Sequence, residues 1–298
     1  MKKSLLALAL VIVTAVTGLA FSSCSSDSEF PVTAGNITIK AEPKNIIILN
    51  KNDADIISCI GYIDKLAGRS DSVNQKGMEL VPSVGSANDP SYSKIKKLKA
   101  DVVFADDTLK ADTKKKLQSS GITVISHEKA DTVEQLKKLY IQLGTLLGGK
   151  TKGKSTGKEA FDDLYDSLNS VKDAVEEKDV KTTVCYLYTE NGEMKTFTNS
   201  TWESLMLDYT GAANVFKNEK SDTVNLKKLT RANPDYIFCA DKETIKPLKS
   251  GKTKKKLSAL NDKTKRYLIP MDELSMQGDT SLETLRKMLK YMYPEDFK

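Results

Sequence analysis

The sequence contains one glycine-rich motif of a kind that binds phosphates. Residues 144–151 read Gly-Thr-Leu-Leu-Gly-Gly-Lys-Thr, which satisfies the pattern G-x-x-x-x-G-K-[ST], and an overlapping match ends at Ser155. In a phosphate-binding loop the glycine amides surround the phosphates, the lysine neutralises them and the hydroxyl holds Mg²⁺. Such a loop must follow a strand, but apolar residues recur at helical spacing from Val133 to Leu147, just before this motif. We therefore predict a helix end and a linker here, not a nucleotide site.

The other reactive side chains form no catalytic set in the sequence. His127 is the only histidine, which argues against sites built from several imidazoles, including those of most zinc enzymes. No G-x-S-x-G nucleophile elbow is present. Cys185 and Cys239 lie in apolar, strand-like runs and fit no disulfide framework with Cys59, so buried thiols are expected. We predict that the protein is not an enzyme and holds no metal ion or cofactor of its own.

The overall composition is that of a folded protein without a nucleic-acid partner. Hydrophobic residues make up 39% and charged residues 29% of the chain, which excludes global disorder. The formal net charge is +6, but the charges are interspersed and no basic arm stands apart, so nucleic-acid binding has little support. A length of 298 residues predicts two domains or one large one.

The N-terminus has the pattern of an export signal. Lys2 and Lys3 precede an uncharged stretch over residues 5–21, and small residues then lead to Cys24. We predict a lipoprotein signal peptide over residues 1–23, lipidation of Cys24 and a polar tether over residues 24–35. An uncleaved anchor is the alternative, because the apolar stretch approaches the length of a membrane-spanning helix. Both interpretations place the rest of the protein outside the cytoplasm, held at the cell membrane.

Beyond residue 35, short apolar runs alternate with helical patterns. The runs at 46–49, 102–104 and 122–125 are continuous, which is typical of strands buried on both faces of a parallel sheet. The second half of the chain repeats this order, since residues 234–241 resemble 100–106 and a lysine-rich helical pattern recurs. Strands that alternate with helices imply βαβ crossovers. The sequence therefore predicts an α/β fold with two Rossmann-like lobes.

One helix is expected to join these lobes. Apolar residues recur at spacings of three and four from Phe161 to Val175, which predicts a single amphipathic helix rather than a flexible linker. We predict an N-terminal lobe over residues 36–152, an interlobe helix over 153–178 and a C-terminal lobe over 179–298.

The cleft between the lobes is the predicted binding site. In open α/β sheets, ligands bind outside the carboxyl ends of the strands, where polar side chains suit an oxygen-rich or anionic ligand. The candidate residues are Asn50, Lys51, Asn52, Asp106, Asp107 and His127 in the first lobe and Tyr188, Asp241, Lys242 and Met271 in the second. Trp202, the only tryptophan, either stacks on a ligand or packs the start of a helix, and the sequence leaves both open.

Several short phrases, taken in order, resemble a known family. They lie at residues 43–49, 81–85, 99–103, 210–215 and 233–238. They are similar to the helical-backbone (class III) substrate-binding lipoproteins of ABC importers, the group that carries ferric siderophores, haem and cobalamin. The resemblance implies ligand capture with a small closure, and delivery to a permease and its ATPase. It also implies one acid on each lobe that pairs with arginines of the permease. In the first lobe this acid is expected near Ser93, where only Asp89 is close. In the second lobe it is expected near Leu226 or Lys227, where the lysine reverses the sign of the charge.

Two functions from different classes remain open. The first is a monomeric binding protein for a bulky metal chelate, with a ferric siderophore expected ahead of haem or a cobamide. A haem would need an axial ligand from His127, a tyrosine or a methionine such as Met271. The second is a surface interaction module that keeps the bilobed fold but no longer serves transport, which the missing docking acids motivate.

Overall fold

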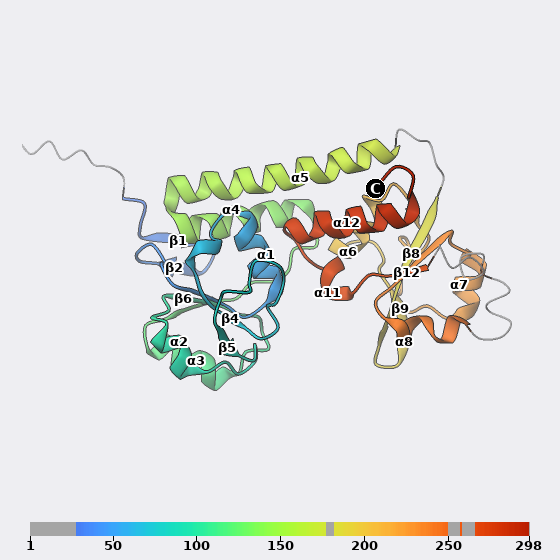
Figure 1. Cartoon of the computed structure of the whole chain (residues 1–298). Helices are drawn as coiled ribbons and strands as arrows, with labels where there is room; N and C mark the ends of the chain where they lie inside the picture. The colour runs from blue at the N-terminus through green and yellow to red at the C-terminus, as the bar shows by residue number, and fades with distance from the viewer. Residues whose placement is uncertain (1–27, 177–181, 250–256, 258–265, 298) are drawn as a thin grey trace, which may run out of the picture.

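The protein consists of two α/β lobes bridged by one long helix (Figure 1). The computed structural model describes residues 28–176, 182–249, 257 and 266–297. The bridging helix, α5, runs from Lys154 to Glu176 along one side of both lobes and lies within the predicted range 153–178. The predicted fold class is confirmed.

The N-terminal lobe contains a five-stranded parallel sheet with the order β5-β4-β3-β6-β7. Its strands are β3 (Ile46–Ile48), β4 (Leu66–Ser70), β5 (Ser83–Gly85), β6 (Val102–Phe104) and β7 (Thr123–Ile125). Its helices are α1 (Lys51–Cys59), the short η1 (Ile63–Lys65), α2 (Tyr92–Lys97) and α3 (Ala111–Ser119). The central strands β3 and β6 are buried at every residue, as a sheet covered on both faces requires.

The C-terminal lobe repeats this plan with one addition. Strands β10, β8, β11 and β12 are parallel, and β9 pairs antiparallel with β8. The strands are β8 (Thr183–Glu190), β9 (Glu193–Thr196), β10 (Ala213–Asn214), β11 (Tyr236–Cys239) and β12 (Arg266–Leu268). The helices are α6 (Trp202–Asp208), α7 (Leu226–Ala232), α8 (Lys242–Ile245), η3 (Pro247–Lys249), α11 (Met271–Leu274) and α12 (Asp279–Met292). The second lysine-rich pattern, at residues 253–256, lies outside the described residues.

The glycine-rich motif forms a close crossing between two helices. Helix α4 (Val133–Gly148) leads through a π-helical turn, η2 (Gly149–Gly153), directly into α5. A Cβ atom built on Gly144 would overlap the carbonyl oxygen of Gly153, and one on Gly157 would overlap that of Tyr140. The glycines therefore let the backbones of α4 and α5 touch, and a helix rather than a strand precedes the motif, as expected.

The start of the described chain is folded, contrary to the predicted tether over residues 24–35. Strands β1 (Val32–Ala34) and β2 (Ile37–Ile39) form a hairpin against α4, and Val32 and Ile39 are buried. The polar composition of this segment obscured two strands of only three residues each. The predicted signal peptide and Cys24 lie outside the described residues. Among the helices that the structure describes, none is long and apolar enough to cross a membrane.

A single hydrophobic cluster runs through both lobes. It joins β3 and β6 of the first lobe to β8 and β11 of the second through buried side chains of α4, α5 and α12. Two smaller clusters cover the opposite face of each sheet. The bridge between the lobes is therefore part of the core and not an exposed linker.

Candidate functional site

Five of the predicted residues meet at the carboxyl edge of the N-terminal sheet. They line a hollow of about 680 Å³, which we call the N-lobe hollow; its residues are Asn50, Asn52, Asp53, Asp106, Asp107, Ser126, His127, Glu128 and Lys129. The residues come from the ends of β3, β6 and β7, three neighbouring strands. The structure therefore brings these five predicted residues together, and their role in ligand binding stays a prediction.

Asn50 and Asp53 form the rigid base of the N-lobe hollow. Asn50 caps α1, because its Oδ1 accepts a hydrogen bond from the Asp53 amide at 2.8 Å. The Asn50 amide group donates in turn to the Asp53 carboxylate at 2.5 Å. The other oxygen of Asp53 lies 2.6 Å from Nε2 of His127. Asp53 is 2% exposed, so its charge is held almost entirely by these partners.

The only histidine is tied at both ring nitrogens. Nε2 contacts Asp53 and Nδ1 lies 3.0 Å from the carbonyl oxygen of Glu128. Burial lowers the pKa of His127, but the hydrogen bond to Asp53 and the charge of that carboxylate outweigh it and raise the pKa to about 8. The side chain is therefore a cation at neutral pH and has no free nitrogen to ligate a haem iron in this arrangement.

Helix α1 also carries the contact between the two lobes. Asn52 donates to Gln277 at 3.1 Å, and Asp55 accepts hydrogen bonds from the Gly278 amide at 2.7 Å and from the Thr280 hydroxyl at 2.7 Å. A Cβ on Gly278 would lie 2.7 Å from Asp55, so only glycine allows this approach. Burial raises the pKa of Asp55 despite these hydrogen bonds.

Two ion pairs join the lobes on either side of this contact. Lys51 reaches Asp272 at 2.5 Å, with 28% and 57% of the respective side chains exposed. Lys129 pairs with Glu203, which is buried and also accepts a hydrogen bond from Ser275 at 2.6 Å. Lys51 therefore bridges the lobes and does not line the N-lobe hollow with its neighbours.

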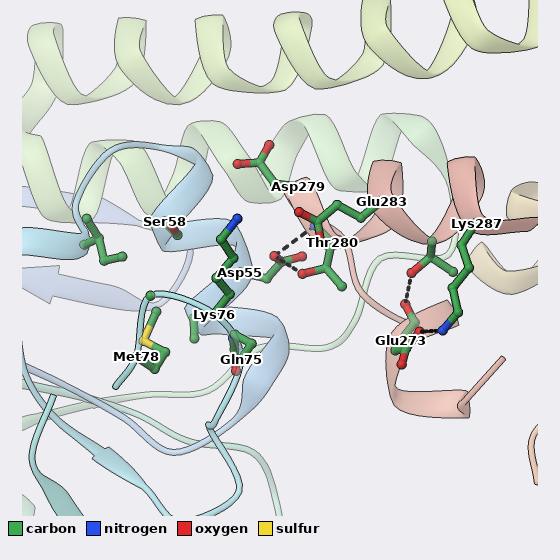
Figure 2. A pocket seen from close by; sticks show the side chains of 14 residues that line it. Asp55, Ser58, Gln75, Lys76, Met78, Glu273, Asp279, Thr280, Glu283 and Lys287 are labelled. Atoms are coloured by element: carbon green, nitrogen blue, oxygen red, sulfur yellow. Dashed lines mark hydrogen bonds and ion pairs between the residues drawn. The ribbon is translucent and has the colours of Figure 1, made fainter. Parts of the chain in front are cut away.

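The lobes enclose a second hollow on the other face of α1 (Figure 2). We call this space of about 600 Å³ the interlobe hollow; its labelled lining residues are Asp55, Ser58, Gln75, Lys76 and Met78 from the first lobe and Glu273, Asp279, Thr280, Glu283 and Lys287 from the second. Ala54, Asp55 and Ser58 face it, whereas Asn52 and Asp53 face the N-lobe hollow, as a turn of 3.6 residues places them.

The sequence predicted a site between the lobes, but none of the residues that line the interlobe hollow was among the candidates. Its first-lobe wall, residues 75–78, follows β4, a strand that the sequence did not reveal. Its second-lobe wall comes from α11 and α12, where Lys287 pairs with Glu273 at 2.8 Å. The acidic cap at residues 279–283 was visible in the sequence, but only as the start of a helix.

The candidates of the second lobe are not brought together. Tyr188 lies inside β8 instead of beyond it, stacks on Phe197 with ring centres 5.0 Å apart and lines a separate hollow of about 470 Å³. Asp241 caps α8 by accepting from the Thr244 amide at 2.7 Å, and Lys242 is exposed on the same helix. Met271 is half-buried at the start of α11, against the main hydrophobic cluster.

Trp202 packs a helix and does not face a ligand. Its side chain is 1% exposed, and the indole N–H donates to the Met276 carbonyl at 2.6 Å. Of the two interpretations that the sequence left open, packing at the start of α6 is therefore correct, and stacking on a ligand is not supported.

Comparison with known proteins identifies a family for this arrangement of two sheets, one bridging helix and polar strand ends. The model of the periplasmic binding protein family matches residues 46–263, which is well over half of the chain. The chain belongs to this family. The predicted resemblance is thus confirmed, and the chain is a binding protein rather than an enzyme.

Among the relatives of this periplasmic binding protein is the uncharacterized ABC transporter substrate-binding lipoprotein YvrC of Bacillus subtilis. The two are 26% identical over 288 residues, which cover 90% of this chain and 88% of the relative. A cobalamin-binding protein of Halobacterium salinarum is 29% identical over 127 residues, or 40% of this chain and 34% of that protein.

Solved structures agree with the fold. A possible iron-binding periplasmic protein of Staphylococcus epidermidis superposes with a TM-score of 0.71 at 19% identity, covering 85% of this chain and all of that one. The periplasmic haem-binding protein of Vibrio cholerae gives a TM-score of 0.66 at 15% identity, covering 84% and 99% of the two chains. At these identities the similarity establishes the architecture and leaves the ligand open.

The positions expected to dock a permease carry few available acids. Asp89 precedes α2 and pairs with Lys110 at 2.7 Å, while also accepting a hydrogen bond from Thr113 at 3.1 Å. On the second lobe Lys227 is exposed at the start of α7, as its sequence position suggested.

Proposed function

We propose that the protein is the extracytoplasmic substrate-binding component of an ABC importer and holds a bulky metal chelate in the N-lobe hollow, on the first-lobe side of the contact between the lobes. The observation that carries the proposal is the N-lobe hollow, a space of about 680 Å³ at the carboxyl edge of the sheet. Binding without chemistry needs hydrogen-bonding groups on a rigid base, and the Asn50–Asp53–His127 set supplies that base. Membership of the family and the relationship to a substrate-binding lipoprotein support the transport role.

The charge of the N-lobe hollow favours a chelate that is rich in hydrogen-bond donors. Four of its lining residues are acids, namely Asp53, Asp106, Asp107 and Glu128, and its two cations, His127 and Lys129, are already paired with acids. An anionic chelate would meet net repulsion there, whereas amide N–H groups would find acceptors. We therefore propose an amide-bearing cobamide ahead of a ferric siderophore or haem, which reverses the order expected from the sequence.

Two further observations agree with a cobamide. His127 is engaged at both nitrogens, which removes the one histidine available to a haem. One of the relatives is named as a cobalamin-binding protein, although the similarity covers only 40% of this chain.

Calorimetric titration with four ligands tests the proposal. Cyanocobalamin and dicyanocobinamide should bind saturably to the purified protein, and a ferric trihydroxamate or haemin should bind more weakly. Asp107 is exposed at the rim of the N-lobe hollow, so Asp107→Asn should weaken cobamide binding about tenfold through the loss of a charged acceptor. Asp112→Asn, on the exposed face of α3 and outside the hollow, is the matched control. Tight haemin binding with no response to cobamides would refute the assignment.

We further propose that the mature protein is a monomer anchored by a lipid on Cys24. The charged pattern before this residue and the lipoprotein relative support the anchor. Mass spectrometry of the membrane-extracted protein should show a diacylglyceryl adduct on Cys24, and Cys24→Ala should abolish it. An unmodified peptide that begins at Met1 would instead support the uncleaved anchor.

The surface interaction module is the second candidate. The pairing of Asp89 with Lys110 and the exposed Lys227 favour it, because they leave the expected docking positions without free acids. Saturable uptake of the chelate by cells, lost on deletion of this chain and of a neighbouring permease, would exclude it.

A further inference from the structure

The first residues that the structure describes lie on the turn between α4 and α5. The Glu29 carboxylate accepts hydrogen bonds from the amides of Thr151 at 2.8 Å and Lys152 at 3.3 Å, and the Lys150 amide donates to the Glu29 carbonyl at 3.2 Å. Gly149 makes room for this contact, since it has a φ of 104° and a Cβ there would lie 2.6 Å from Cβ of Glu29. Glu29 is therefore held against this turn.

The hairpin that follows strengthens this attachment. Val32 and Ile39 are 2% and 4% exposed, and Gln142 of α4 donates to the Ala34 carbonyl at 3.4 Å. Glu29 therefore lies against the folded body, and in the sequence it follows Cys24 by only five positions.

Exposed lysines surround Glu29. Lys150, Lys152 and Lys154, which we call the basic turn, are all exposed, and none forms an ion pair with an acid among the residues that the structure describes. Glu42 lies beside them: the hydrogen bond and charge of Lys65, followed by the charges of Lys152 and Lys44, lower its pKa. The cations therefore outnumber the acids around Glu29.

We propose that the basic turn lies against the anionic phospholipid headgroups of the membrane that carries the anchor. The inference rests on the lipid that the proposed function places on Cys24. Four peptide links separate Cys24 from Ser28 and span at most about 14 Å. The lipid thus holds the turn within reach of the headgroups, where each lysine gains from the negative surface potential.

This arrangement fixes which part of the molecule faces the membrane while no permease is bound. Figure 1 shows α2 and α3 at the end of the N-terminal lobe opposite the hairpin and the start of α5. Helix α3 carries Lys115 and Lys116, both exposed, at this opposite end of the lobe. The two lysine groups therefore provide an internal control, because only one of them is expected to meet lipid.

Lysine footprinting of the lipidated full-length mature protein tests the proposal. The protein is placed in nanodiscs of either phosphatidylglycerol with phosphatidylcholine or phosphatidylcholine alone, and amine labelling is followed by mass spectrometry. On the anionic discs, labelling of Lys150, Lys152 and Lys154 should slow at least fivefold, while that of Lys115 and Lys116 stays unchanged. High salt should remove the protection.

A charge variant tests the affinity directly. The triple variant K150Q/K152Q/K154Q should bind anionic discs roughly a hundredfold more weakly when the acyl chains are removed by lipase, at about fivefold per lysine. The triple variant K114Q/K115Q/K116Q should bind like the parent protein. Equal labelling on both disc types, or protection that appears only when a permease is added, would overturn the proposal. Absence of the lipid from Cys24 would show by mass, and would refute the anchor while leaving ligand binding to be measured separately.

Discussion

The two sides of the interlobe connection are built in opposite ways. On one side, α4, α5 and α12 join the lobes through a continuous apolar cluster in which backbone touches backbone at Gly144 and Gly153. On the other side, polar pairs join the lobes: Asn52 with Gln277, Lys51 with Asp272 and Lys129 with Glu203. The apolar side fixes the distance between the lobes, and the polar side can exchange partners with water or a ligand. Substitutions on the two sides should therefore differ in kind as well as in size.

The largest effect is expected at the helix crossing. Gly144→Ala places a methyl group against the Gly153 carbonyl, where neither backbone can yield without parting α4 from α5. We expect a loss of about 3 kcal/mol in the free energy of unfolding, measured by urea denaturation. Ser155→Ala, at an exposed position on α5, should change it by less than about 0.5 kcal/mol. Equal stability of Gly144→Ala and the parent would mean that the crossing is not a tight contact.

The buried ion pair between the lobes should rank next. Lys129→Met leaves Glu203 buried without its cation, with only the Ser275 hydroxyl as partner, and should cost about 2 kcal/mol. Because the loss of stability comes from the unpaired charge of Glu203, adding Glu203→Gln should recover most of the lost free energy of unfolding. A double-mutant cycle by urea denaturation measures the coupling. Additive losses in the double variant would show that the pair does not join the lobes.

His127 should show a comparable effect, but one that depends on pH. A single imidazole signal in the proton spectrum should titrate with a pKa of about 8 in the parent and with a lower pKa in Asp53→Asn, where only the Glu128 carbonyl still opposes the effect of burial. The raised folded-state pKa means that this stabilisation is complete below pH 6.5 and is lost as the pH rises through 8. The rise of this pKa from 6.5 to about 8 corresponds to about 2 kcal/mol. A parent that titrates at 6.5 would show that the contact is absent in solution.

The smallest effect is expected at the exposed bridge. Lys51→Ala removes an ion pair whose partners are 28% and 57% exposed, so water replaces much of the interaction. We expect a loss of under about 1 kcal/mol that vanishes in 1 M salt. Urea denaturation at two salt concentrations measures it. A loss as large as that of Lys129→Met would remove the distinction between exposed and buried contacts.

The contrast between apolar and polar packing also explains which strands the sequence could predict. Strands β3, β6 and β7 are continuous apolar runs and were found, whereas β4 reads Leu-Ala-Gly-Arg-Ser and was missed. A Cβ at its glycine, Gly68, would lie 2.8 Å from the side-chain ends of Ile47 and Leu98, so both side chains would have to move. Such a constraint comes from neighbours that are distant in sequence, and no local pattern carries it.

The candidate site was predictable where strands ended at an evident boundary. The N-lobe hollow follows directly from three recognised strands. In the second lobe, β8 continues through Tyr188 to Glu190 because β9 pairs with it, so the predicted strand end was too early. The contacts of α1 with residues 277–280 join positions more than 200 apart in the chain, and their side chains gave no periodic signal.

The apolar cluster that passes through α4, α5 and α12 has a thermodynamic consequence for the whole molecule. Neither lobe can lose its packing without exposing side chains on which the other depends, since the shared helices belong to both. The two lobes should therefore melt together in one calorimetric peak, with a van't Hoff enthalpy equal to the calorimetric one, despite the bilobed shape.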